Sequence, residues 1–232
     1  DYKPYNSVED FYRTGLISST SINLAGSGNN VGYNMNYGYL SDEGFTPGNK
    51  LIRNNFGFGG NAKLSNNLTA SATFNYTIND FKSPPTGYSS GSGAVEGPSA
   101  FGDLFYTPRT VDLMGLPFQN PVTGAAIYYR ADNAIQNPRW TVDNSFIRQQ
   151  VNRTFGNAQL RYAIMKGLNL TYRLGYDKYT EDHTQAQNKG GSDGNVNGFY
   201  RTIRGVNNIW DHTLLANYVG QLNDDWAISV DA

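Results

Sequence analysis

Glu181, Asp182 and His183 are the residues best suited to acid, base or metal chemistry, and they follow one another directly. A metal site needs several convergent ligands with supporting partners, and one short run of residues does not supply them. A Ser-His-Asp nucleophile would have to use His183 or His212, and no nucleophile-elbow motif exists. We therefore expect no enzymatic activity, no metal and no cofactor, and we interpret this run as the solvated start of a loop.

The glycine-rich stretches are equally unsuited to ligand chemistry. The run 191–198 carries oxygen ligands but lacks the spacing of a calcium-binding loop. The glycines at 87, 91, 93 and 97 are not followed by a lysine at phosphate-loop spacing. Both stretches are typical of surface loops, which argues against calcium and nucleotide binding.

Aromatic and basic residues gather in one long irregular stretch, from Ser83 to Asn144, and these have binding chemistry. Aromatic rings stack on sugars, and Tyr, Trp and Arg dominate protein interfaces. A loop of this length is usually functional or disordered. Two interpretations stay open: these residues contact a ligand or a covering partner, or their aromatics pack the loop on itself. The candidate contact residues are Phe105, Tyr106, Arg109, Tyr128, Tyr129, Arg130, Arg139 and Trp140.

The elements that position this loop are predicted to be paired β-strands. Apolar and polar residues alternate along each segment; for example, Leu174 and Tyr176 alternate with Arg173 and Asp177. Short turns join the two strands of a pair, and long loops join one pair to the next. The expected strands cover residues 16–25, 31–40, 51–64, 68–79, 153–164, 168–179, 209–222 and 226 onward.

Charged residues are segregated to one side of these strands, and the opposite side is apolar. A charge on the lipid face of a membrane barrel costs roughly 2–4 kcal/mol at the midplane, so lipid exposure would select this segregation. The other face, rich in Asn, Thr, Ser, Gln and Arg, suits a wet lumen. The charges on that face are Arg53, Lys63, Arg153, Arg161, Arg173, Asp177 and Asp211.

Aromatic residues on the apolar side lean toward the long loops, as in an interfacial girdle, while the short-turn ends are mostly aliphatic. By the usual orientation of outer-membrane barrels, the loops at 80–152 and 180–208 would be extracellular and the short turns periplasmic. Residues 1–15 form an entry segment, with a capping-box pattern at Ser7 and a helical turn expected at 8–13.

Composition limits the remaining classes. The 232 residues carry a formal net charge of -1, which argues against a nucleic-acid partner. With no cysteine, a disulfide framework is impossible. The mean hydropathy of -0.54 would suit a soluble protein, but barrel strands dilute this signal because half their residues face away from lipid. No apolar run approaches the ~20 residues of a membrane helix.

Several stretches resemble the SusC/RagA family of TonB-linked outer-membrane transporters. The likeness covers essentially the whole chain and depends on the order and spacing of the motifs together. They are DFYRTG at 10–15, YGYLSDEG at 37–44, RNNF at 53–56, NPRWTVDN at 137–144, NRTFG at 152–156 and LTYRLGY at 170–176.

The resemblance implies a large plugged barrel of about 22 strands. Such proteins lie in the cell outer membrane, surrounded by its lipids, and import oligosaccharides or peptides with energy from the TonB complex. A SusD-like surface lipoprotein covers their extracellular loops as a lid. We expect residues 1–232 to form one partial barrel domain of about eight strands, since the strand pattern stops within a strand at Ala232. We do not expect this chain to include the plug.

Two alternatives remain at this point. One is a small eight-stranded outer-membrane barrel acting as an adhesin or structural protein. The other is a soluble carbohydrate-binding β-sandwich, which the charge-free face disfavours.

Overall fold

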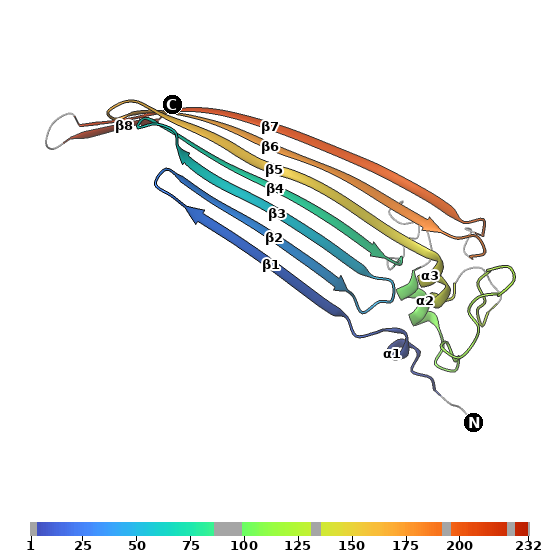
Figure 1. The fold of residues 1–232 in the computed structure, drawn as a ribbon. Coiled ribbons are helices and arrows are strands. Elements are labelled where there is room, and N and C mark those ends of the chain that lie inside the picture. Colours follow the sequence, from blue (N-terminus) through green and yellow to red (C-terminus); the bar gives the residue numbers. More distant parts are fainter. Residues whose placement is uncertain (1–3, 86–98, 131–135, 192–195, 222–225, 232) are drawn as a thin grey trace.

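A single antiparallel sheet of eight strands forms the body of this computed structural model, which describes residues 4–85, 99–130, 136–191, 196–221 and 226–231. Each strand pairs with the next along the chain, so the order in the sheet is β1 to β8 (Figure 1). This confirms the predicted all-β antiparallel fold. The strands are β1 (Leu16–Ser27), β2 (Val31–Glu43), β3 (Lys50–Lys63), β4 (Leu68–Ser83), β5 (Ser145–Met165), β6 (Leu168–Gln187), β7 (Phe199–Gln221) and β8 (Ala227–Asp231).

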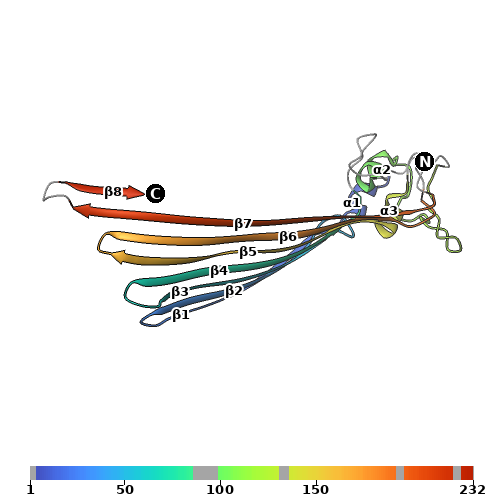
Figure 2. The same ribbon diagram turned by 90° about the horizontal axis from the view of Figure 1, so that it is seen from above.

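Three short helices gather at one end of the sheet, opposite the short turns (Figure 2). They are α1 (Ser7–Phe11), α2 (Ala100–Tyr106) and α3 (Pro138–Asn144). The Ser99 hydroxyl accepts the Gly102 N–H at 3.0 Å and so begins α2. The Asn137 side chain does the same for α3 by accepting the Arg139 N–H at 3.0 Å. None of these helices, nor any other in the described part of the chain, is long and apolar enough to cross a membrane.

The N-terminal helical turn forms one residue earlier than the sequence predicts. Asn6 occupies the N-cap position, and Ser7 is the first helical residue, so the predicted capping box does not form. Ser7 instead donates its hydroxyl to the carbonyl of Val111 at 3.4 Å. The entry segment is therefore joined to the long β4–β5 connection.

Strands β5 to β7 run further toward the loops than the alternation predicts. β5 begins at Ser145, β6 continues to Gln187 and β7 begins at Phe199. The predicted loops at 80–152 and 180–208 are correspondingly shorter. In these extensions both faces carry polar side chains, so the backbone pairing continues without the apolar alternation that identifies a strand in the sequence.

The sheet is open along both edges in the part of the chain that the structure describes. β1 pairs with β2 alone, and β8 pairs with β7 alone. A closed eight-stranded barrel would need β1 to pair with β8, and a sandwich would need a second sheet. Neither arrangement occurs among the described residues, so the small barrel and the soluble sandwich do not match this fold.

Buried apolar side chains lie at the loop end of the molecule, not along the sheet. Phe11, Leu104 and Leu113 form one cluster, and Tyr128 and Val142 pack against it. The apolar side chains of the sheet are largely exposed instead. Contiguous exposed apolar surface on this scale marks an interaction surface, because monomeric soluble proteins rarely carry it.

Three parts of the sequence interpretation fall wholly or partly outside the described residues. The expected last turn at 223–225 and the glycines at 87, 91, 93 and 97 are among them, as is the middle of the run 191–198. The turn between β5 and β6 is described: Gly167 adopts a φ of 87°, a left-handed conformation that glycine adopts without steric cost.

Candidate functional site

One face of the sheet carries a band of apolar side chains that the strand register aligns from strand to strand. Leu24, Met35, Phe58 and Phe74 lie in register across β1 to β4. Leu174 of β6 lies two residues along the same face from Tyr176. The seven charged residues predicted to lie on the opposite, polar face all lie there in the observed strand register. The sequence-based assignment of the two faces is therefore confirmed.

Aromatic rings concentrate toward the loop end of this band. Tyr37, Phe56 and Tyr76 lie in register on three strands, with ring centroids 4.9 Å and 6.4 Å apart. Tyr176 and Trp210 form a second contact at 4.4 Å. The short-turn end is less aliphatic than the sequence suggested, because exposed aromatics lie there too. They are Tyr33, Tyr162 and Tyr218.

The apolar band crosses the strands obliquely. Its side chains run over Leu68–Ile78 on β4 and over Leu168–Tyr176 on β6. Ile78 of β4 is in register with Asn152 of β5, and Asn152 is in register with Thr180 of β6. Thr180 lies beyond Tyr176, where the apolar residues of β6 end. The strands are therefore tilted relative to the band, and each crosses it over about 9–11 residues, the length that a tilted transmembrane strand needs.

Beyond the band, the same face becomes charged at the loop end. Asp80 accepts hydrogen bonds from Arg148, with an N–O distance of 2.5 Å, and Asp182 accepts from Arg204 at 2.7 Å. The sequence interpretation missed this zone because the predicted strands ended before these four residues and because Lys178, inside the strand predicted over 168–179, was not assigned to the apolar side. The signal available was a cation at the continuing even spacing past the last apolar residue, such as Lys178 after Tyr176.

The polar face differs in composition between β2–β3 and β5–β6. On β2 and β3, asparagines lie opposite glycines: Asn34 faces Gly59, and Asn36 faces Gly57. A Cβ at Gly57 would lie 1.8 Å from the Asn36 side-chain oxygen, so the carboxamide occupies the space that the glycine leaves. On β5 and β6 charges appear, and Arg153 pairs with Asp177 at 2.6 Å. This face offers amides, hydroxyls and guanidinium groups to a polar ligand.

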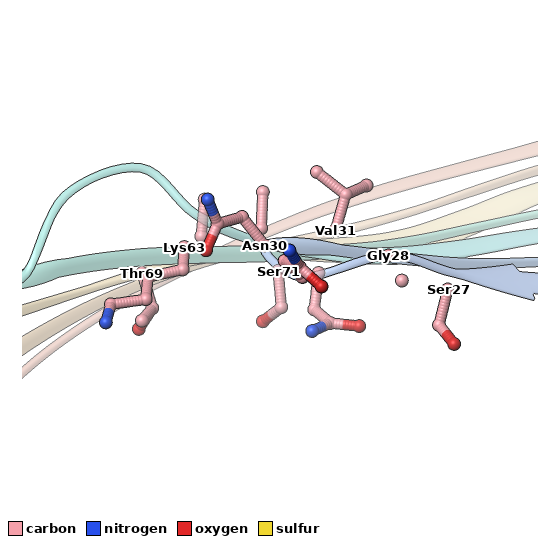
Figure 3. A pocket seen from close by; sticks show the side chains of 12 residues that line it. Ser27, Gly28, Asn30, Val31, Lys63, Thr69 and Ser71 are labelled. Carbon is pink, nitrogen blue, oxygen red and sulfur yellow. The ribbon is translucent and has the colours of Figure 1, made fainter.

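A hollow of about 410 Å³ lies among the short turns that join β1 to β2 and β3 to β4. Figure 3 shows Ser27 and Thr69 on one side of the sheet and Val31 on the other. The hollow thus wraps the rim of the sheet and is open to both faces. Its lining is mostly small and neutral, with Lys63 as its one charged residue, so it presents no catalytic arrangement.

Three of the eight candidate contact residues hold the long connection together. Trp140 is fully buried, and its indole N–H donates to the carbonyl of Gly124 at 2.9 Å. One terminal nitrogen of Arg139 donates to three carbonyls, at 3.1, 3.0 and 2.9 Å, and the guanidinium lies 4.3 Å from the Phe118 ring centroid. Burial raises the pKa of Tyr128 to about 12. These contacts are the self-packing that was one of the two interpretations.

The other five candidates lie at the surface: Phe105, Tyr106, Arg109, Tyr129 and Arg130. Phe105 and Tyr106 are 59% and 69% exposed. The Tyr129 hydroxyl donates to the Tyr106 carbonyl at 3.4 Å, so these two belong to one surface.

Phe101 extends that aromatic surface. Its ring lies 4.7 Å from that of Phe105, and its side chain is 51% exposed. Phe101 belongs to the same aromatic-rich stretch of the sequence, 83–144, but it is not one of the eight candidate contact residues. Its spacing of four residues from Phe105 on a helix was the available signal.

Glu181, Asp182 and His183 do not converge. The run lies within β6, not at the start of a loop, so successive side chains point to opposite faces of the sheet. Asp182 pairs with Arg204 on one face, while Glu181 accepts from Gln149 on the other. Across the described ranges, no cluster of three or more His, Cys, Asp or Glu residues is placed to hold a metal ion.

Comparison with known proteins finds likeness at the level of the fold. No protein-family model matches the chain, and no curated protein matches it. Three structures of the RagAB system do match. The RagAB peptide importer in its closed-closed state gives a TM-score of 0.72 at 16% identity over 95% of this chain. The RagAB peptide transporter gives 0.72 at 17% over 96%, and the importer in its open-open state gives 0.74 at 15% over 95%.

The chain spans about a quarter of the matched proteins, 24% of each. At these identities the likeness establishes the fold. The fold of this chain is thus similar to that of part of a chain in a peptide importer.

Proposed function

We propose that this chain is part of the barrel wall of an outer-membrane, TonB-dependent importer of the SusC/RagA type, which takes up peptides or oligosaccharides. The observation that carries the proposal is the oblique apolar band with an aromatic rim at each margin. Outer-membrane barrels carry such a band, and their strands tilt by about 35–45°. The fold likeness to the RagAB importer supports the same assignment.

The two faces of the sheet suit the two environments of such a wall. The apolar band excludes charges, each of which would cost roughly 2–4 kcal/mol at the bilayer midplane. The opposite face would line the lumen with the carboxamides of β2 and β3 and the charged residues of β5 and β6. Carboxamides and guanidinium groups bind peptide backbones, carboxylates and sugar hydroxyls alike. This lining supports import of small polar chains, peptides and oligosaccharides alike.

Cysteine labelling of neighbouring positions on β6 tests the membrane assignment, and the chain has no native cysteine to interfere. In the full-length gene product, Leu174→Cys should react with a lipid-dissolved probe and not with a water-soluble maleimide. Arg173→Cys, its matched control on the opposite face, should show the reverse. Equal reaction of both positions with the maleimide would contradict the proposal.

Growth measurements test import and energy coupling. Deleting the gene should abolish growth on a peptide mixture or on an oligosaccharide as sole nutrient, and deleting TonB should have the same effect. Growth that survives on every such nutrient would refute the import function while leaving the membrane assignment intact.

The exposed aromatic surface at the loop end is our candidate for contact with a SusD-like surface lipoprotein. Phe101, Phe105 and Tyr106 project from α2, and large aromatics dominate the binding energy of protein interfaces. Replacing Phe105 and Tyr106 together by Ser should reduce lipoprotein co-purification at least tenfold. Val122→Ser, at a position 91% exposed, is the matched control and should leave co-purification unchanged.

A further inference from the structure

On five consecutive strands one cation lies past the loop end of the apolar run and on the apolar side of the sheet; Lys178 follows Tyr176 by two residues, whereas Arg148 precedes Ala158 by ten. We call this set the basic margin. It consists of Lys50 on β3, Lys82 on β4, Arg148 on β5, Lys178 on β6 and Arg204 on β7.

The register places like charges of the basic margin side by side. Lys50 is directly opposite Lys82, and Lys82 is directly opposite Arg148. Neighbouring strands are about 4.8 Å apart, so the three cations span roughly 10 Å. Like charges directly opposite each other destabilise a sheet. The arrangement therefore costs stability unless anions neutralise it.

Carboxylates of the protein neutralise the basic margin only in part. Lys50 pairs with Glu43 at 3.0 Å, Arg148 with Asp80 and Arg204 with Asp182. Among the described residues no carboxylate forms a salt bridge with Lys82 or with Lys178, although the Asp80 carboxylate also interacts electrostatically with Lys82. The Lys82 ammonium instead lies 5.0 Å from the Phe146 ring centroid. Five cations against three carboxylates leave a net positive surface.

An apolar hollow of about 390 Å³ lies on the same face of the sheet, toward the short turns, and is lined by residues of β1 to β4. Phe56 lines it and lies about 20 Å along β3 from Lys50, given the rise of about 3.4 Å per residue. A molecule with an anionic head and apolar tails would contact both features at once. The lining residues also include Ile22, Met35, Phe58 and Phe74.

We propose that the basic margin binds the phosphate groups of outer-leaflet lipids, whose acyl chains extend along the apolar band toward the hollow. The proposal rests on the membrane assignment made above. It follows from the position of the cations at the edge of the band, where lipid headgroups lie. A free phosphate ion would match the charges but would gain nothing from the apolar surface.

The test measures binding of diphosphoryl lipid A to the delipidated full-length gene product in detergent, by native mass spectrometry. A juxtamembrane lysine contributes about 1 kcal/mol to lipid binding, roughly fivefold in affinity. The double variant Lys50→Gln with Lys82→Gln should therefore bind about 25-fold more weakly. Lys50→Arg with Lys82→Arg should retain binding, which separates lost charge from altered folding. Removing two lysines at the short turns, Lys63→Gln with Lys166→Gln, is the matched control and should change nothing.

Two results would overturn the inference. One is equal lipid affinity in the Gln variant and the unmodified protein. The other is displacement of the lipid by inorganic phosphate at an equal phosphate concentration, which would identify an anion site that ignores the acyl chains. The labelling of Leu174→Cys keeps the two proposals separate. If a lipid-dissolved probe reaches that cysteine and the lysine variants still bind normally, lipid recognition alone fails. If the probe does not reach it, both proposals fail.

Discussion

Tyr128 combines burial with hydrogen bonding inside the long β4–β5 connection. Its hydroxyl contacts the Thr107 hydroxyl and donates to the Asp103 carbonyl at 3.3 Å. Burial favours the neutral phenol and raises the pKa of Tyr128 to about 12. This contribution to loop stability is fully present below pH 10, the pKa of an unperturbed tyrosine, and it is lost as pH rises through 12.

We therefore predict that Tyr128→Phe loosens the loop at neutral pH and removes part of its sensitivity to alkali. The lost hydrogen bonds should cost about 1 kcal/mol each at pH 7. Hydrogen exchange within 100–130 should then be faster in the variant at pH 7, and the difference from the unmodified protein should shrink between pH 10 and 12. A difference that stays constant over that range would contradict the burial of the phenol. Tyr106→Phe, at a surface position, should leave exchange unchanged at pH 7.

The sequence predicted least well whether an individual side chain is buried or exposed. Trp140 and Tyr106 look alike in a sequence, since both are aromatics of one irregular stretch. Trp140 is buried because its indole reaches Gly124, while Tyr106 projects from a short helix. Which aromatic turns inward depends on contacts between distant segments, such as Phe11 with Leu104, and no local pattern encodes them.

At the scale of the elements, Gly156 shows how closely β4 and β5 approach. A Cβ at this position would lie 2.1 Å from the carbonyl oxygen of Thr73, a backbone atom that cannot move without shifting its strand. We predict that Gly156→Val destabilises the protein by about 1–3 kcal/mol, the usual cost of overpacking. Chemical unfolding of the full-length gene product in lipid bilayers would measure this change.

Ala158→Val is the matched control for that substitution. Ala158 lies two residues along the same strand and face, and it already carries a Cβ. The control should change the free energy of unfolding by much less. Equal effects of the two variants would mean that β-branching on this face, and not the close approach of the backbones, sets the cost.

Strand identity was predictable wherever one face is apolar, and strand ends were not. Within the band, alternation and short turns identified all eight strands, and the register confirms which side each residue takes. Past the band, β6 continues through Lys178 to Gln187 with polar residues on both faces. Backbone hydrogen bonding to β5 and β7 extends it there, and that term is independent of side-chain pattern.

At the scale of the whole molecule, the apolar band crosses the strands obliquely. The free-energy cost of a charged side chain on this face therefore depends on its position along the strand, not on side-chain type. Leu174 and Thr180 lie on the same strand and the same face of β6, but Leu174 is inside the band and Thr180 is beyond it. We predict that Leu174→Lys destabilises the full-length protein in a bilayer by roughly 2–4 kcal/mol, and Thr180→Lys by about 0–1 kcal/mol. Equilibrium unfolding in lipid vesicles measures both. The difference should collapse in a detergent-free aqueous refolding assay, where neither position meets hydrocarbon. Equal costs in vesicles would mean that the band is not the surface that meets lipid. A graded cost would locate the outer edge of the bilayer between Tyr176 and Thr180, at the level of Lys178 of the basic margin.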